Sequence, residues 1–577
     1  MKKVFTIFLA FLMVFTLAAC KKDKGDGGKS NEVTAVKITG KAQVKLGGAD
    51  LQLTAVVTPS TATTTFTWES SDPTIATVDQ NGLVHGVKLG MVKISVITAN
   101  NKVGTKSIKV TDEEIIDYPD LQGYTIRIVH AANRLYEYDP FFSDGEEVYR
   151  GLDIMEAQAS WEAVESDYNC HIQVVPYPSD AAWGDSRWDF VISQAINNRT
   201  EFDVCVITDS FIPRMVSGGA LYSMSSWYDK YGNDFMDYAY IKSGTYKGQL
   251  YSLTASRSDV YNILGVNLGL LDQVREKDPT IKEPAEMFME DNWSFDSFYA
   301  WCKKVQNVLD SQFSTEDVKF YTLSGYSTYY WAGMLNASGV TIADTATYKV
   351  NILGDLEDEV AKLVKLLKTE GIMDPADQVD SHVTSWVNNH AVINTGEFWF
   401  VNDTQRWPKE AWGEGEATRY GYAPYPSKTG TKDEYKLAVF GGQTWVMPIG
   451  INYSNYGEDC TPENIYHALM DYLQRTEKAY KSSDSYDEEM AQFTINSRAF
   501  SSEASVKAIS WINLHSTQIN FFDPMSYEGN QVANLYSSDF ANAAKDYFNS
   551  VGGDKTWAEA VGTLQETMDK AVLTIYG

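Results

Sequence analysis

Two short segments of this 577-residue chain carry side chains that could hold a polar ligand. Each follows an apolar run typical of a buried strand, residues 124–129 and residues 202–207. Ligands of parallel α/β sheets bind beyond the carboxyl ends of the strands, where both segments are expected to lie. Amide, guanidinium and carboxylate groups bond polar ligands, and an aromatic ring can cover an apolar face. The candidates for ligand binding are Asn133, Arg134 and Glu137 after the first run, and Asp209 and Phe211 after the second.

Aromatic residues are abundant, with 15 Trp, 35 Tyr and 25 Phe, and such residues serve in cores or in binding sites. The three consecutive aromatic residues 329–331 cannot all face one helix core, so at least one is expected to be exposed. Trp331 is the favoured residue, with Tyr330 beside it. Trp445 follows two glycines, which permit a close approach of the backbone. Tyr330, Trp331 and Trp445 are therefore further candidates for ligand contact, and the alternative for each is core packing.

Motifs for catalysis and metal binding are absent from the sequence. It contains no GxSxG, GxxxxGK[ST], GxGxxG, HExxH or DxDxDG, and its seven histidines lack metal-ligand spacing. We therefore predict no catalytic residue, no metal and no cofactor. A pair of carboxylates about 5 Å apart would serve a retaining glycosidase, but spacing cannot select one from 77 acidic residues. Glycoside hydrolysis stays open as an alternative.

The elements that must position the candidates alternate between strand and helix. This order predicts a parallel sheet in an α/β fold. The expected strands are 124–129, 171–175 and 202–207, and the expected helices between them are 154–168 and 186–197. The chain has 48 basic and 77 acidic residues and a net charge of −29, which argues against a nucleic-acid partner.

The N-terminus has the layout of a secretory signal, with two lysines followed by an uncharged run over residues 4–19. The run ends in Leu-Ala-Ala-Cys20, which resembles the bacterial lipobox. This resemblance implies that residues 1–19 are removed and that Cys20 is acylated and holds the protein on the bilayer. The alternative is an ordinary signal with a chance cysteine. Residues 20–32 are charged and glycine-rich, and they are expected to form a flexible tether.

The remaining cysteines are far apart in the sequence and include no CxxC pair. Free buried thiols are favoured over disulfides for all of them. They are Cys170, Cys205, Cys302 and Cys460.

Residues 33–111 form a region of short alternating strands separated by turns, which predicts a β-sandwich. The segment Trp68-Glu-Ser-Ser-Asp-Pro73, the following 75–79 and the Gly82-Leu-Val84 turn resemble the bacterial immunoglobulin-like domain of group 2. Trp68 is expected in the core of the sandwich.

Residues 122–577 carry an ordered series of short motifs that resembles the extracellular solute-binding proteins of ABC importers, family 1, whose members mostly bind carbohydrates. The strand at 246–253 lacks the family's final proline, and Val266 replaces the usual tyrosine. The matching segments are 202–204, 219–228, 246–253, 264–268, 293–298, 387–399, 421–426 and 441–448.

This resemblance implies a two-lobed, periplasmic-binding-protein-like α/β fold behind the small all-β sandwich. Both lobes are discontinuous in such a fold, and the ligand sits between them. We expect the first lobe at 122–260 with 380–430, and the second at 265–375 with 435–577. The resemblance also places Glu397, Trp399 and Arg257 along the cleft, where rings would stack on a sugar and polar groups would bond its hydroxyls.

The sequence therefore predicts a monomeric receptor on the extracellular face of a bacterial membrane. Its expected partners are a carbohydrate ligand, the permease of an ABC importer and, through acylated Cys20, the lipid bilayer. A cell-surface glycan adhesin is the main alternative, and a glycoside hydrolase is the second.

Overall fold

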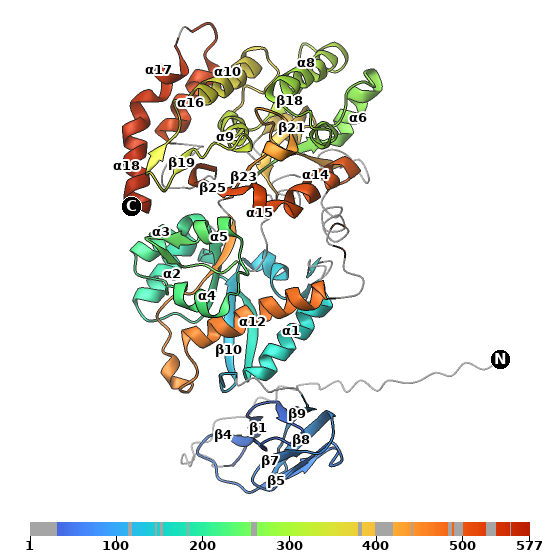
Figure 1. Cartoon of the computed structure of the whole chain (residues 1–577), viewed down its shortest axis with the longest axis vertical. Helices are drawn as coiled ribbons and strands as arrows, with labels where there is room; N and C mark the ends of the chain where they lie inside the picture. The colour runs from blue at the N-terminus through green and yellow to red at the C-terminus, as the bar shows by residue number, and fades with distance from the viewer. Residues whose placement is uncertain are drawn as a thin grey trace, which may run out of the picture. The chain divides into compact units, whose positions relative to one another are not determined.

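The computed structural model describes residues 32–112, 118–144, 147–149, 154–181, 184–254, 262–378, 383–398, 419–439, 442–482, 487, 489, 500–526, 538–553 and 555–577. Cys20, Arg257 and Trp399 lie outside these residues, as do the expected signal peptide and nearly all of the tether. The chain divides into two compact units, one ending at Ile115 and the other running from Ile116 to Gly577. Figure 1 labels the elements of both.

The first unit is built only of strands. Its largest sheet has the order β2-β9-β8-β5, and smaller sheets pair β1 with β4 and join β3, β7 and β6. The strands are β1 Ala35–Thr39, β2 Gln43–Lys45, β3 Leu51–Gln52, β4 Thr54–Thr58, β5 Phe66–Ser70, β6 Ala76–Val78, β7 Leu83–Gly86, β8 Gly90–Thr98 and β9 Val103–Thr111.

The core of the first unit comes from strand alternation. Val92, Ile94 and Val96 of β8 point inward and are buried, while the residues between them face outward or are partly exposed. They pack with Trp68, which is 4% exposed. The predictions of a β-sandwich and of a core position for Trp68 are confirmed.

The second unit contains two four-stranded sheets. The sheet of the first lobe has the order β13-β10-β14-β24. β10 (Tyr124–His130), β13 (Cys170–Pro176) and β14 (Val204–Thr208) are parallel, and β24 (Gln443–Val446) runs antiparallel to β14. The three parallel strands are those predicted from the sequence.

Helices cover both faces of this sheet, and the first four residues of β14, which alternate between the faces, are all buried. α1 (Ile154–Asp167) packs against α12 (Pro462–Lys481), and Figure 1 shows the orange α12 beside the cyan α1. α2 (Gly184–Ile196) supplies Trp188 and Val191 to the core on the other face. α1 and α2 confirm the two predicted helices. The remaining helices of this lobe are α3 Ile212–Ser217, α4 Ser225–Tyr231 and α5 Tyr238–Ser243.

The sheet of the second lobe has the order β18-β21-β17-β22. β18 (Tyr321–Ser324) and β21 (Ala391–Glu397) are parallel, and β17 (Asn262–Asn267) is antiparallel to β21 and β22 (Tyr420–Ala423). Its helices include α6 Leu268–Lys277, α7 Pro284–Met289, α8 Phe295–Gln312, α9 Ser327–Ala337, α10 Asp355–Thr369, α11 Thr384–Val387, α14 Glu503–Leu514, α15 Ser516–Ile519, α16 Asp539–Asn549, α17 Trp557–Val561 and α18 Gln565–Tyr576. A separate parallel pair joins β23 (Leu437–Val439) to β25 (Asn520–Phe522).

The predicted division of the chain between the lobes is partly wrong. β21 and β22, expected in the first lobe, pair with β17 in the second. β24, expected in the second lobe, pairs with β14 in the first, and α12 follows it there. All seven residues of β21 are buried, as suits a strand flanked on both sides, and that pattern does not reveal which sheet the strand joins. The described residues of the segments 265–375 and 503–577 pack around the second sheet.

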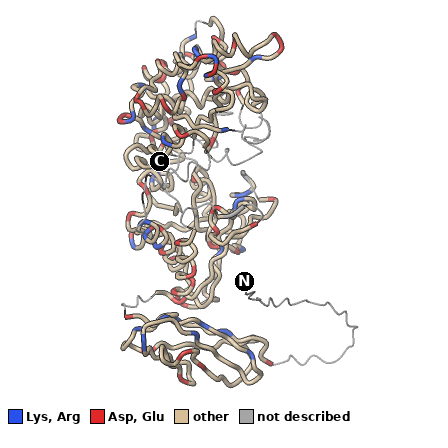
Figure 2. The backbone as a smooth tube through the Cα atoms, turned by 90° about the vertical axis from the view of Figure 1, so that its right-hand side faces the viewer, with Lys and Arg blue, Asp and Glu red and all other residues tan. Residues whose placement is uncertain are grey.

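The four described cysteines beyond the tether are buried free thiols, as predicted. Burial raises the pKa of each, so none is poised to react as a thiolate. Acidic and basic positions are interspersed along both units rather than gathered in one block (Figure 2). Among the described residues, no helix is long and apolar enough to cross a membrane.

A buried carboxylate ties the amino end of the first sheet together. Asp203, which directly precedes β14, is 0% exposed. Its Oδ1 accepts hydrogen bonds from the hydroxyls of Tyr124 and Tyr453, each at 2.8 Å, and its Oδ2 accepts from the backbone N–H of Arg127 at 2.8 Å. Burial raises the pKa of Asp203 to about 6, although these hydrogen bonds oppose the shift.

The raised pKa makes stability depend on pH in a defined direction. Protonated Asp203 favours the folded state, so its contribution is complete below 3.8 and is lost as pH rises through about 6. We expect the unfolding free energy of the wild type, minus that of Asp203→Asn, to fall across this window by at most about 3 kcal/mol. Denaturant titrations of both proteins from pH 4 to pH 7 measure it, and a flat difference contradicts the assignment.

Candidate functional site

The carboxyl end of β10 carries a cluster of hydrogen-bonded polar groups. His130 ends the strand, and its Nε2 lies 2.9 Å from Oε2 of Glu137. Oε1 of Glu137 lies 3.4 Å from Nη1 of Arg134. Arg134 and Glu137 belong to the 3₁₀ turn η1 (Ala132–Glu137), which stacks residues three apart on one side. Burial lowers the pKa of His130, which favours the neutral imidazole, and Glu137 opposes the shift.

Gln443 completes this cluster from a distant part of the chain. It begins β24, opposite Thr208 of β14, and its side chain meets Tyr138 across 305 residues of sequence. With the amide oriented to satisfy both its atoms, its nitrogen donates to Glu137 Oε2 at 3.0 Å and to Tyr138 Oη at 3.1 Å, and its oxygen accepts from Arg134 at 3.0 Å. We call His130, Arg134, Glu137, Tyr138 and Gln443 the first-lobe cluster.

Exposure differs within the first-lobe cluster. His130 is 1% exposed and Arg134 is buried, whereas the carboxylate of Glu137 and the side chains of Tyr138 and Gln443 are half-buried. Solvent therefore reaches the acidic and amide groups, while the guanidinium and imidazole hold them from behind. A ligand with hydroxyl groups would meet fixed acceptors and donors here.

Asp209 and Phe211 lie at the same edge of the sheet, in the turn after β14. Asp209 is 1% exposed, and its backbone N–H donates to the carbonyl of Gly442 at 3.0 Å. Phe211 is half-buried and stacks on Trp188, with ring centroids 3.6 Å apart and planes at 21°. Asn133 is exposed on η1. The two loops therefore follow the adjacent strands β10 and β14 at the same edge of the sheet.

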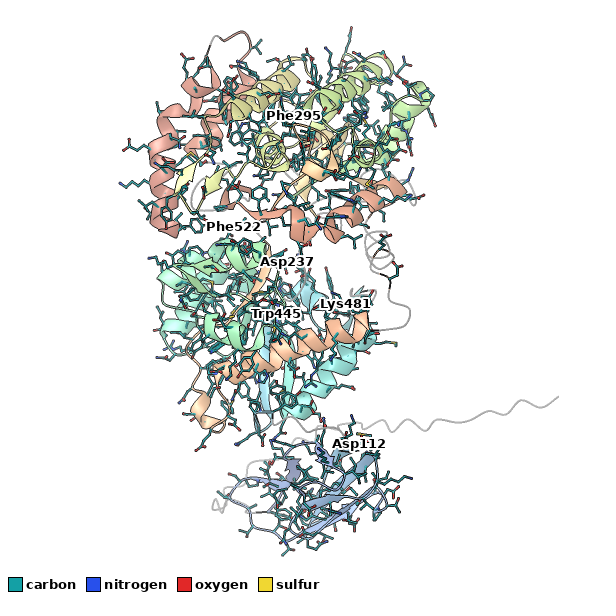
Figure 3. All side chains as sticks on the ribbon, in the orientation of Figure 1. Asp112, Asp237, Phe295, Trp445, Lys481 and Phe522 are labelled. Carbon is teal, nitrogen blue, oxygen red and sulfur yellow. The ribbon has the colours of Figure 1, made fainter. Side chains whose placement is uncertain are left out.

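The three tryptophan and tyrosine candidates are core residues. Trp445 is 1% exposed and makes an edge-to-face contact with Tyr138, and Figure 3 places it within the body of the first lobe. Tyr330 and Trp331 on α9 are 0% exposed, and the indole N–H of Trp331 donates to the carbonyl of Glu357 at 3.2 Å. The expectation that Trp331 is exposed is wrong, because α9 is surrounded by other elements and buries residues on all sides. These rings offer no open face to a ligand.

The second sheet also places polar side chains at the carboxyl ends of its parallel strands. Glu397 ends β21, is 3% exposed, and lies opposite Asn262 at the start of β17. After β18, the backbone N–H and the hydroxyl of Ser327 donate to Asp377 at 2.7 and 2.5 Å. The ammonium of Lys545 lies 4.3 Å from the ring centroid of Tyr326.

A buried lysine accompanies Asp377. Nζ of Lys368 lies 3.6 Å from the Asp377 carboxylate and donates to the carbonyl of Asp374 at 3.0 Å. Burial lowers the pKa of Lys368, and the two aspartates oppose that shift. We call Tyr326, Ser327, Lys368, Asp377 and Lys545 the second-lobe cluster. The sequence reasoning missed every member, since residues from three distant segments meet here and none has a distinctive local motif.

The carboxyl edge of each sheet lies where the chain passes between the lobes. Leu253 and Trp445 exchange backbone hydrogen bonds at 2.8 and 2.9 Å, just before one passage and just after the other. At the second sheet, β17 begins at Asn262, which pairs with Glu397 at the carboxyl end of β21. In the first sheet, β24 begins at Gln443, which pairs with Thr208 at the carboxyl end of β14. The carboxyl edge of each sheet therefore lies beside the connections to the other lobe.

Comparison with known proteins agrees with this architecture. The second unit is similar to the cyclic α-maltosyl-1,6-maltose binding protein of Arthrobacter globiformis, at 13% identity and a TM-score of 0.50, over 78% of this chain and 100% of that one. The second unit has the fold of a periplasmic sugar-binding protein. The two-lobed α/β prediction is thereby confirmed, and at this identity the likeness shows the fold alone.

The first unit matches a different set of proteins. Residues 32–110 match the model of the bacterial Ig-like domain (group 2). The first unit resembles part of the lacto-N-biosidase of Bifidobacterium bifidum, with 33% identity over 103 residues, and of the 3-O-alpha-D-galactosyl-alpha-L-arabinofuranosidase of Bifidobacterium longum, with 39% over 97 residues. These matches cover 17% and 15% of this chain, which spans only 9% and 8% of those proteins. Among the described residues, no group of three or more His, Cys, Asp or Glu side chains is placed to hold a metal ion.

A glycine makes the turn that leads into the second-lobe cluster. Gly325 has φ +93°, and a Cβ at this position would overlap the hydroxyl of Thr395 on β21. We expect Gly325→Ala to destabilise the protein by about 2–4 kcal/mol, from backbone strain plus the steric clash. The matched control is Gly371→Ala, where φ is +69° but no heavy atom lies within 4 Å, and which should cost about 1 kcal/mol. Chemical denaturation measures both, and equal losses would exclude the clash.

Proposed function

We propose that this protein is the receptor of an ABC importer, and that it captures a carbohydrate between the two lobes without altering it chemically. The observation that carries the proposal is the placement of a polar cluster at the carboxyl edge of each sheet, beside the passages between the lobes. The shared fold with a maltosyl-maltose binding protein supports it.

The chemistry of the two edges suits a hydroxyl-rich ligand. The carboxylates of Glu137 and Asp377 can accept hydrogen bonds from sugar hydroxyls, and the amide of Gln443 can donate as well as accept. The ring of Tyr326 and the stacked ring of Phe211 offer apolar faces for the C–H side of a sugar. A buried polar group left without a partner costs about 1–3 kcal/mol, so these groups discriminate among ligands by their hydroxyl patterns.

Capture would proceed by a shift between open and closed arrangements of the lobes. A ligand that touches both clusters only in the closed arrangement stabilises that arrangement by its differential affinity. The passages next to Leu253 and Trp445 are the hinge in this proposal, and the connection from α12 to α14 is a further covalent link between the lobes. The closed form would then deliver the sugar to the permease.

Glu137 provides the direct test of the site. We expect Glu137→Gln to weaken binding of the preferred oligosaccharide at least about tenfold, because a charge-assisted acceptor becomes a neutral amide. Titration calorimetry of the full chain against a panel of neutral oligosaccharides measures it. Glu162→Gln is the control, since Glu162 is exposed on α1 of the same lobe. No binding across the panel, or release of shorter sugars, would reject the receptor function.

Membrane attachment is tested separately at Cys20. We propose that acylation of Cys20 holds the protein at the extracellular face, with residues 21–32 as tether and the immunoglobulin-like unit as spacer. Cys20→Ser should move the protein from the membrane fraction to the medium, because the thiol that accepts the lipid is gone. Immunoblots of both fractions measure this, and a variant that stays with the membrane would contradict the anchor.

A further inference from the structure

The first lobe has a hollow that is separate from the first-lobe cluster. It has a volume of about 660 Å³, which is within the range of small-ligand sites. Arg127 and Val129 of β10 and Val175 of β13 are among the residues that line it. Strand side chains alternate between faces, so Arg127 and Val129 project opposite to Ile126 and Ile128. None of the five residues of the first-lobe cluster lines it.

The walls of this hollow combine charged, amide and apolar groups. Phe190 and Gln194 come from α2, and Arg199 and Glu201 come from the connection between α2 and β14. We call the site the Arg127 hollow. Ile451 and Tyr456 from the segment after β24 complete the lining, which therefore comes from several separate parts of the first lobe.

Two guanidinium groups in the Arg127 hollow are available for an anion. The only hydrogen bond from the Arg127 side chain to another described residue goes to the carbonyl of Thr125, at 3.4 Å. Within the described part of the chain, neither Arg127 nor Arg199 forms an ion pair. Arg475 is the contrast, since it binds the carboxylates of Asp167 and Asp471 at 2.7 and 2.6 Å. The charge of Arg127 also acts on the buried carboxylate of Asp203, and Glu201 lines the hollow, but no carboxylate of the described residues lies within ion-pair distance of either arginine.

The groups beside the arginines narrow the ligand class. A guanidinium presents a planar fork that fits a carboxylate or a phosphate. Glu201 would repel a bare anion but can accept hydrogen bonds from hydroxyls, and Gln194 can bond them too. The ring of Phe190 supplies an apolar face. A sugar ring that carries both hydroxyls and a carboxylate satisfies all of these groups.

We propose that the Arg127 hollow is a second saccharide site, which binds an acidic sugar unit of the uronate class. The carboxylate lies between Arg127 and Arg199, and the ring lies toward Phe190 with its hydroxyls on Glu201 and Gln194. This site does not depend on the cleft between the lobes. It would hold the protein on acidic surface glycan while the cleft remains free for another ligand.

The test uses the full chain and a galacturonate trimer, with its fully methyl-esterified form as the uncharged probe. We expect the double variant Arg127→Gln/Arg199→Gln to weaken binding of the trimer at least about tenfold, since two charge-assisted contacts are lost. The esterified trimer should bind the wild type at least about tenfold more weakly than the acid. Calorimetry measures both affinities. A rising salt concentration should weaken binding of the acidic trimer and leave binding of the esterified trimer unchanged.

Matched variants separate this site from the cleft and from misfolding. Arg214→Gln removes an arginine that is ion-paired with Asp189, so trimer binding should be unchanged. Arg199→Gln alone changes an exposed side chain that the fold does not need, and it should still weaken the trimer. Three results would overturn the proposal. They are unchanged trimer binding in Arg199→Gln, equal binding of the acidic and esterified trimers by the wild type, and loss of trimer binding in Glu137→Gln. Inorganic phosphate that competes at the same concentration as the trimer would overturn the saccharide assignment.

Discussion

The antiparallel pairing of β24 with β14 determines how the second unit is assembled. The chain builds most of the first sheet, leaves to build the second, and returns as β24 with Gln443 opposite Thr208. This return, followed by the crossing from α12 to α14 in the second lobe, makes both lobes discontinuous and joins them by several connections rather than by a single linker. It also delivers Gln443 to Glu137 and Tyr138, so the first-lobe cluster exists only when the distant strand has docked. Sheet closure and site formation are therefore one event.

The sequence was sufficient for elements that depend on local pattern. β10, β13 and β14 were predicted from apolar runs, and α1 and α2 from helical spacing between them. The lobe to which β21 or β24 belongs was not predictable in this way, because each is a short buried run with no mark of its partner. Only the register, Leu264 beside Thr395 or Val206 beside Trp445, decides it. That information is spread over segments more than a hundred residues apart.

The same limit explains which site residues were found. Arg134 and Glu137 follow an apolar run directly, so their position at the strand end was readable. His130, Tyr138 and Gln443 required knowledge of how the turn folds back and which strand lies beside it. The aromatic candidates failed for another reason. A tryptophan in the sequence indicates only a large apolar side chain with one N–H donor. The indole N–H of Trp331 finds its acceptor inside the core. Composition alone therefore cannot distinguish a packed ring from one that contacts a ligand.

The arrangement of the first-lobe cluster bears on the cost of binding. Ordering a free side chain at an interface costs about 0.5–1.5 kcal/mol, which reduces affinity. The carboxylate of Glu137 is already held by Arg134 and Gln443 and faces a neutral His130, so little ordering remains when a ligand arrives. In the proposed receptor, the free energy of closing the lobes would then depend mainly on the hydroxyl contacts that form across the cleft. Because the edge of each sheet is preorganised, the free energy of closure would depend on which ligand is bound rather than on the flexibility of the site.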